Sequence, residues 1–150
     1  MVNVTWEDAR AYADWVNKRL PTEAEWEWAA RGTEGREYSW GKQVNQDFAN
    51  FNNPEGGTSS VDRYIKGQSE FGIWDMCGNV GEWVNDWYEA THYARSPDSD
   101  PQGTPDGRQK VYRGGGYQTN RIDICALSRH NAMPTMYQNY TGFRCGLSSE

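Results

Sequence analysis

The stretch Arg19-Leu-Pro-Thr-Glu-Ala-Glu-Trp26 decides how the first part of this 150-residue chain folds. Thr22 is a preferred residue for the N-cap of a helix, and Glu25 stands three residues later, where it completes a capping box. The helical pattern continues through Ala30 and meets a glycine at position 32, a common residue just past a helix end. The stretch therefore predicts a helix that begins after Thr22 and stops at Gly32.

A second capping pattern lies upstream of this helix. Thr5 is followed by Asp8 at the box position, and the apolar spacing predicts a helix over Trp6 to Lys18. Downstream, residues 33–60 are polar and rich in glycine and asparagine, and residues 88–110 hold three of the six prolines. Both segments are predicted to be long irregular loops.

The second half of the chain predicts strands rather than helices. Short runs bounded by glycine and polar turns indicate strands at Glu82 to Trp87, Val111 to Tyr117, Ile124 to Arg129 and Thr141 to Gly146. Helices followed by strands are typical of the α+β class. We therefore expect one α+β domain over residues 1–150, with two N-terminal helices and an irregular antiparallel sheet with long loops.

Composition excludes several classes of function. Fifteen Lys and Arg against 21 Asp and Glu give a net charge of −6, which argues against a nucleic-acid partner. No run approaches the roughly eighteen apolar residues of a membrane span, and residues 1–5 lack the features of a signal peptide. The compartment stays open. Eight Trp, nine Tyr and four Phe supply large rings for a core despite a hydrophobic fraction of 36%.

Four blocks of sequence resemble one family. The Arg19–Trp26 stretch is followed in order by Asp75-Met-Cys-Gly-Asn-Val-Gly-Glu-Trp83, Tyr112-Arg-Gly-Gly-Gly116 and Thr141-Gly-Phe-Arg-Cys145. Together they resemble the signature of the formylglycine-generating-enzyme (sulfatase-modifying factor) family. The resemblance implies a variant of the C-type-lectin fold, and the family includes both enzymes and non-catalytic binding proteins.

The enzymatic residues of the family do not map onto this chain. The resemblance implies a copper-binding cysteine pair just after the Arg-Gly-Gly-Ser block, but residues 116–124 contain no cysteine, and the usual serine is Gly116. Two histidines, His92 and His130, are too few for the three-histidine iron site of other members. We therefore nominate no catalytic residue and expect no copper. The three cysteines allow at most one disulfide, and we expect free thiols.

A calcium site is the metal site that the resemblance implies. Its ligands would be the side chains of Asp75 and Glu82 and the carbonyls of Gly78 and Val80, an all-oxygen set that suits a hard cation. The alternative is that Asp75 caps the turn while Glu82 forms a buried ion pair with an arginine such as Arg144. A second calcium site of the family would use Asn50, although the loop after it is short.

A binding face is predicted between Tyr117 and Tyr140. Tyrosine gives large contacts at small entropic cost and asparagine, threonine and histidine give adaptable hydrogen bonds, so the mixture is typical of a paratope. It also resembles the variable region of diversity-generating-retroelement proteins, which use this scaffold. The alternative is a fixed, ordinary non-catalytic member. The candidate residues are Tyr117, Thr119, Asn120, Ile122, Asp123, Ile124, His130, Asn131, Thr135, Tyr137, Asn139 and Tyr140.

These observations favour a non-catalytic protein that binds a protein or glycan ligand on a calcium-stabilised lectin-like scaffold. Two other functions stay open. The chain could be a formylglycine-generating oxidase or a related metal-dependent enzyme, or a regulatory module cut from a longer chain.

Overall fold

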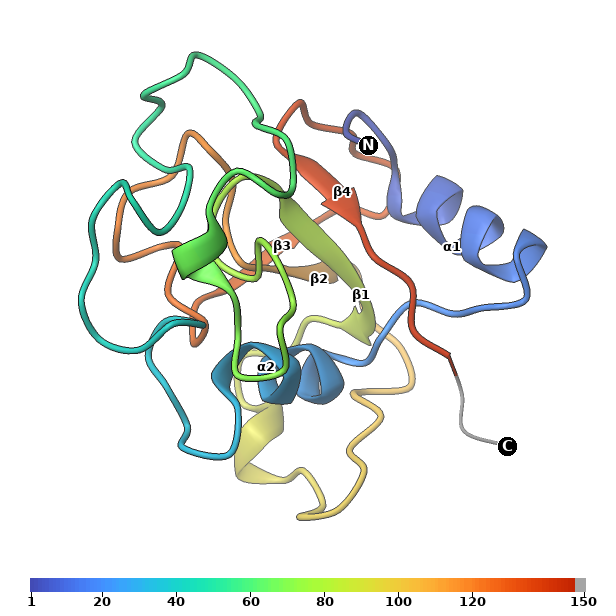
Figure 1. Cartoon of the computed structure of the whole chain (residues 1–150). Coiled ribbons are helices and arrows are strands. Elements are labelled where there is room, and N and C mark those ends of the chain that lie inside the picture. Colours follow the sequence, from blue (N-terminus) through green and yellow to red (C-terminus); the bar gives the residue numbers. More distant parts are fainter. Residues whose placement is uncertain (148–150) are drawn as a thin grey trace.

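The computed structural model describes residues 1–147, in which helices pack around a small central sheet (Figure 1). The strand order is β3-β2-β1-β4. In Figure 1, α1 lies beside the β4 edge, and the long segment that follows α2 covers the opposite side. The elements are α1 (Trp6–Trp15), α2 (Glu23–Arg31), the 3-10 turn η1 (Ile65–Gly67), β1 (Gly81–Trp87), the 3-10 turn η2 (His92–Ala94), β2 (Lys110–Arg113), β3 (Arg129–Ala132) and β4 (Thr141–Phe143).

Both predicted helix starts are confirmed. The hydroxyls of Thr5 and Thr22 accept hydrogen bonds from the backbone N–H groups of Asp8 and Glu25, and both capping boxes are complete. The end of α2 at Gly32, with φ 65°, is confirmed as well. By contrast, α1 ends at Trp15, three residues before the predicted Lys18, and Asn17 adopts a left-handed φ of 55°.

The sheet corrects three strand predictions. β1 matches its prediction, but β2 ends at Arg113 because Gly114 and Gly115 take positive φ values of 86° and 64°. Residues 124–128 form turns, and the strand predicted there begins only at Arg129. β4 pairs parallel to β1, so the sheet is mixed rather than antiparallel.

The core lies where the two helices meet the sheet. Trp26 is 1% exposed and packs with Met76, Val84 and Val111, and its indole N–H donates to Glu82 (2.7 Å). A second cluster joins Trp6 to Trp83. The remaining helix tryptophans, Trp15 and Trp28, are 77% and 59% exposed. No helix in the described residues is both long and apolar enough to span a membrane.

A network of ion pairs connects α2 to the sheet. Arg113 is fully buried, and its guanidinium donates to the carboxylates of Glu23 (2.8 Å) and Glu27 (2.7 Å). Arg129, on β3, donates hydrogen bonds to both carboxylate oxygens of Glu23 at 2.7 and 2.8 Å. Because these charges neutralise one another, the network fixes α2 against β2 and β3.

Candidate functional site

Two segments of the predicted face meet at Gly116. A side chain on Gly116 would bring its Cβ within 2.8 Å of the Cβ of Tyr140 and 2.9 Å of its carbonyl oxygen. Nearby, the amide of Gln118 donates to the Oδ1 of Asn139 (3.0 Å). The absence of a side chain at position 116 therefore lets the segment after β2 pack directly against the segment before β4.

The turn after Tyr117 is held by its own polar side chains. The hydroxyl of Thr119 donates to the carbonyl of Gly116 (2.7 Å), and the Oδ1 of Asn120 accepts from the backbone of Ile122 (2.8 Å). The amide of Asn120 also donates to the carboxylate of Asp123 (2.7 Å). This Asx-type turn orders the backbone and leaves Ile122 68% exposed.

β3 adds a histidine to the same region. His130 stacks on Tyr112 with ring centroids 5.1 Å apart, and its Nε2 lies 2.9 Å from the carbonyl oxygen of Asp123. Burial, together with the neighbouring Tyr140, raises the pKa of Tyr112 to about 12, so its phenol stays protonated at neutral pH. His130 therefore connects the strand to the Asn120 turn rather than standing free on the surface.

The loop between β3 and β4 carries three of the exposed residues of the face, Thr135, Tyr137 and Asn139. Tyr137 is 69% exposed. The loop is held at both ends, because the carbonyl of Pro134 accepts from the backbone of Trp6 (3.0 Å) and that of Gln138 from the backbone of Asn3 (3.1 Å). The N-terminus accordingly runs beside this loop, near the label N in Figure 1.

The twelve candidate face residues differ widely in exposure. Ile124 is fully buried in the main core and Tyr117 is 6% exposed, so neither is available to a ligand; both support the face from beneath. The half-buried residues are Thr119, Asp123, His130, Asn131 and Tyr140. The exposed residues are Asn120, Ile122, Thr135, Tyr137 and Asn139.

Five further exposed residues between Tyr117 and Tyr140 were missing from the predicted face: Gln118, Arg121, Leu127, Met133 and Met136. Gln118 bridges to Asn139, and Met133 and Met136 are 42% and 45% exposed beside Tyr137. The sequence contained one signal for the two methionines, since residues 130–140 include no Asp, Glu, Lys or Arg. The residue types by which the face was predicted, tyrosine, asparagine, threonine, histidine, aspartate and isoleucine, do not include methionine.

The predicted calcium residues are divided between two arrangements. Both carboxylate oxygens of Glu82 accept from Arg144, at 2.5 and 2.6 Å, which is the alternative stated for this residue. Asp75, with φ 54°, accepts from the amide of Asn79 (2.9 Å), and burial raises its pKa to about 6. Asp75, Val80 and Glu82 line one pocket of about 410 Å³. The carbonyl of Gly78, another predicted ligand, accepts from the backbone N–H of Val80 (2.8 Å).

Two of the three thiols are buried, whereas Cys145 and the other histidine, His92, are half-buried. Cys77 is buried, which raises its pKa to about 12, and the thiol of Cys125 donates to the carbonyl of Glu37 (3.1 Å). All three cysteines, which lie within the described residues, are free as expected. His92 is half-buried, and its Nε2 is buried without a hydrogen-bond partner.

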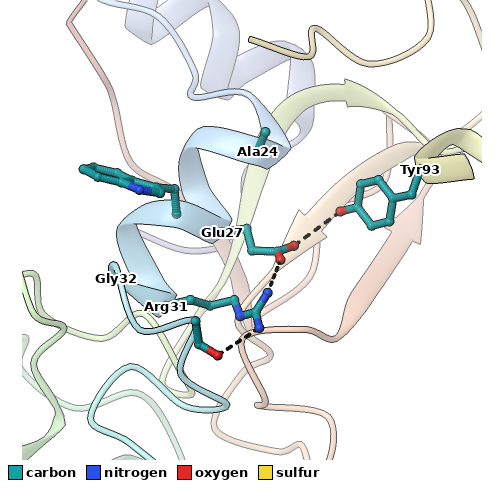
Figure 2. Close-up of a pocket in the computed structure, with 7 residues that line it drawn as sticks. Ala24, Glu27, Arg31, Gly32 and Tyr93 are labelled. Carbon is teal, nitrogen blue, oxygen red and sulfur yellow. Dashed lines mark hydrogen bonds and ion pairs between the residues drawn. The ribbon is translucent and has the colours of Figure 1, made fainter. Parts of the chain in front are cut away.

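A pocket of about 340 Å³ lies on α2, away from the predicted face (Figure 2). Tyr93 points across it toward Glu27, whose carboxylate accepts from Arg31 (2.8 Å) and, at 3.4 Å, from the phenol of Tyr93. Arg31 also donates to the carbonyl of Gly35 (2.9 Å). These polar groups form hydrogen bonds with one another. The pocket therefore lies at the outer end of the ion-pair network that connects α2 to the sheet.

Comparison with known proteins places this geometry in a family. Residues 1–148 match the model of the sulfatase-modifying factor enzyme 1-like domain. The chain is 41% identical to the formylglycine-generating enzyme of Streptomyces coelicolor, covering 97% of itself and 51% of the enzyme. It is 40% identical to the serine/threonine-protein kinase pkn1 of Chlamydia pneumoniae, covering 97% of itself and 23% of the kinase.

A solved structure shows the same scaffold. Treponema denticola variable protein 1 matches with a TM-score of 0.84 and 25% identity over 95% of this chain and 69% of that one. The curated relatives are longer, since the chain spans about half of the Streptomyces enzyme and about a quarter of the kinase. The predicted fold and family are thus confirmed: the chain belongs to the sulfatase-modifying factor enzyme 1-like family.

Proposed function

We propose that this chain is a non-catalytic ligand-binding domain whose ligand contacts the exposed residues between Gln118 and Asn139. The observation that carries the proposal is the combination of exposure and order on this face. Tyr137, Ile122 and Asn139 project from turns that are hydrogen-bonded to the sheet, to the N-terminus or to one another. A preorganised surface of this kind loses little entropy when it binds.

The contacts of Gly116 and of the cysteines disfavour the oxidase alternative. Copper oxidation in the family, as the resemblance implies, needs two thiolates beside the face. Here Cys77 has a pKa of about 12, and Cys125 is buried against the carbonyl of Glu37. A serine at position 116 would collide with Tyr140. These contacts support a binding role over thiolate chemistry.

The module alternative is compatible with the same face. The chain aligns with the kinase over 149 positions and with the Streptomyces enzyme over 165. It therefore matches the kinase with fewer insertions at a similar identity. A domain of this kind could work alone or within a longer protein, and in both cases the exposed face between Gln118 and Asn139 would contact the ligand.

We further propose that the residues of the face vary between copies of the gene, as in diversity-generating-retroelement proteins; the similarity to the Treponema variable protein supports this. Sequencing the coding locus and its flanks in a source population tests this directly. A near-copy of the segment encoding Tyr112 to Cys145, with mismatches at adenines, is the expected result. Uniform sequences with no such copy would leave a fixed binding face.

A structural calcium ion at the Asp75 turn is part of the proposal. Asp75 offers a half-buried carboxylate with a neutral partner, Asn79, which also contacts Asn50 (3.4 Å). The Oδ1 of Asn50 is buried with no hydrogen-bond partner, as expected of an oxygen that a cation would satisfy. Glu82 is held by Arg144, so Asp75 would contribute the main charge.

Thermal unfolding with chelator and then with excess calcium tests this site. A ligand at about 100 times its Kd stabilises the folded state by about 2.7 kcal/mol, so the midpoint should rise on calcium addition. Asp75→Asn should remove the rise. Equal midpoints in chelator and calcium would contradict the site.

Binding itself is tested with two defined probes, a glycan array and a phage-displayed library of random peptides. Wild-type protein should bind members of at least one, and Tyr137→Ala should lose that binding. Trp28→Ala is the matched control, because Trp28 is an exposed aromatic residue on α2. Binding that survives Tyr137→Ala but not Trp28→Ala would overturn the proposal. So would copper-dependent formation of an aldehyde from cysteine-containing peptides.

A further inference from the structure

The segment from His130 to Tyr140 differs from the rest of the chain in charge. It contains no Asp, Glu, Lys or Arg, although 24% of all residues are charged. With histidine neutral, the whole net charge of −6 is therefore carried outside this segment. Depletion of Asp, Glu and Lys is the compositional mark of the centre of a protein interface.

Large apolar side chains are exposed within the same segment. Met133, Met136 and Tyr137 are 42%, 45% and 69% exposed within five residues. Tyrosine and methionine are enriched at protein interfaces, and methionine adapts its shape to an irregular apolar partner. A sugar hydroxyl buried against a methionine would lose its bonds to water without replacement, which costs free energy. The exposed chemistry thus favours a protein surface over a glycan.

The loop is ordered and has an acidic neighbour. The backbone of Met136 donates to the carbonyl of Met133 (2.9 Å), and the Pro134 carbonyl joins the loop to the start of α1. The first turn of α1 exposes Glu7 and Asp8. Hydrogen bonds from Thr5 lower the pKa of Asp8, which keeps its carboxylate charged. An apolar centre is thus flanked by negative charge.

We propose that residues 133–137 form the centre of a docking surface for a protein with an apolar patch flanked by lysine or arginine. This inference rests on the proposed function, because it names the class of ligand for the same face. Met133, Met136 and Tyr137 contact the apolar patch. Glu7 and Asp8 lie opposite the basic groups and, with the net charge of −6, speed the encounter.

The first test uses peptides from the random library that bind wild-type protein. Enriched peptides should combine aromatic or aliphatic residues with lysine or arginine. Tyr137→Ala should weaken their binding by about 30-fold, as expected of an interface hot spot. Glu7→Lys should slow association, more so at low salt, whereas Asp98→Lys makes the same charge change in the long loop after β1 and should have a smaller effect.

The second test maps contact through the four methionines of the chain. In mild peroxide, bound peptide should protect Met133 and Met136 from oxidation to the sulfoxide. Met1, which is 82% exposed on the N-terminal segment beside the loop, reports whether the peptide also covers that segment, and the fully buried Met76 should stay reduced in both samples. The four residues therefore provide the signal, a probe of the neighbouring segment and the buried control in one digest.

The outcomes separate this inference from the proposed function. If Tyr137→Ala abolishes binding to a glycan, and no peptide shows binding that depends on Tyr137, the protein partner is overturned and the binding face is kept. Peptides that protect neither Met133 nor Met136 would also overturn it. If neither probe gives binding that depends on Tyr137, the proposed function fails as well.

Discussion

The ion-pair network beneath α2 and the loop between β3 and β4 are opposites in chemistry. The network buries Arg113 and Glu23 with oxygen-to-nitrogen distances below 3 Å, whereas residues 130–140 carry no formal charge and expose Tyr137. Buried ions require fixed partners, because an unpaired charge in the interior is strongly unfavourable. Exposed neutral residues can change with little effect on folding. The residues that hold the scaffold together are thus different from the residues that can vary and determine which ligand binds.

Among the substitutions that test this difference, Arg113→Met should cause the largest loss of stability. Removing the fully buried guanidinium leaves Glu23 and Glu27 without their shared partner, and we expect a loss of about 3–5 kcal/mol in the free energy of unfolding. Lys66→Met is the control, since Lys66 forms an exposed pair with Asp47 and should cost less than about 1 kcal/mol. Urea denaturation of both variants measures the difference. Equal midpoints would show that the network is not holding the scaffold.

Ile124 and Ile122 test the boundary between core and face within three residues. Ile124 is fully buried, so Ile124→Ala should cost about 2–5 kcal/mol of unfolding free energy. Ile122 is 68% exposed, so Ile122→Ala should stay within about 0.5 kcal/mol. In a binding assay the order should be reversed: Ile122→Ala, which stays stable, should bind the ligand more weakly. Similar losses of stability for both would break the distinction.

Gly116→Ser tests the contact that joins the two segments of the face. The new side chain would meet the Cβ and the carbonyl oxygen of Tyr140 below 3.0 Å, so we expect a loss of about 1–3 kcal/mol from overpacking. Gly57→Ser is the control, because no other residue lies within 4 Å of a Cβ placed at Gly57. Chemical denaturation compares the two. A stable Gly116→Ser variant would mean that Tyr140 moves aside at little cost.

Local signals in the sequence were enough for both helix starts, for the end of α2 and for β1. Thr5 and Thr22 act through residues three positions away, so their capping boxes can be recognised without tertiary information. The position of β3 could not be predicted in this way. Arg129 pairs with Glu23, which is 106 positions away in sequence, and no local pattern encodes that partner.

The candidate face was predictable as a region but not residue by residue. Ile122 and Ile124 look alike in sequence, and only the turn at Asn120 determines which one faces the core. The parallel direction of β4 could not be predicted from local sequence either. A three-residue strand carries no local information on whether its neighbour runs parallel or antiparallel, because that is set by the path of the preceding chain.

The smallest expected effect is a pH dependence that comes from the scaffold side. Burial raises the pKa of Asp86 from 3.8 to about 6; the hydrogen bond from the Glu23 backbone opposes this rise, as do the charges of Lys110 and His92, while the Glu23 carboxylate supports it. Between these two values the folded state binds more protons than the unfolded state, so this group favours folding below pH 4 and loses that contribution as the pH rises through about 6. Lys110, whose pKa is lowered to about 8, is protonated in both states throughout this window.

Asp86→Asn should therefore flatten the stability profile between about pH 4 and pH 6. The amide oxygen can still accept the hydrogen bond from the backbone of Glu23 (2.7 Å), so the N-terminus of α2 keeps its partner. Thermal midpoints across this range measure the slope, and Asp98→Asn in the exposed loop controls for the loss of one charge. A profile unchanged by Asp86→Asn would assign the slope to another group, with Asp75, whose pKa is also raised to about 6, as the next carboxylate to replace. Because both carboxylates lie outside residues 130–140, the affinity of the docking loop should not follow this titration.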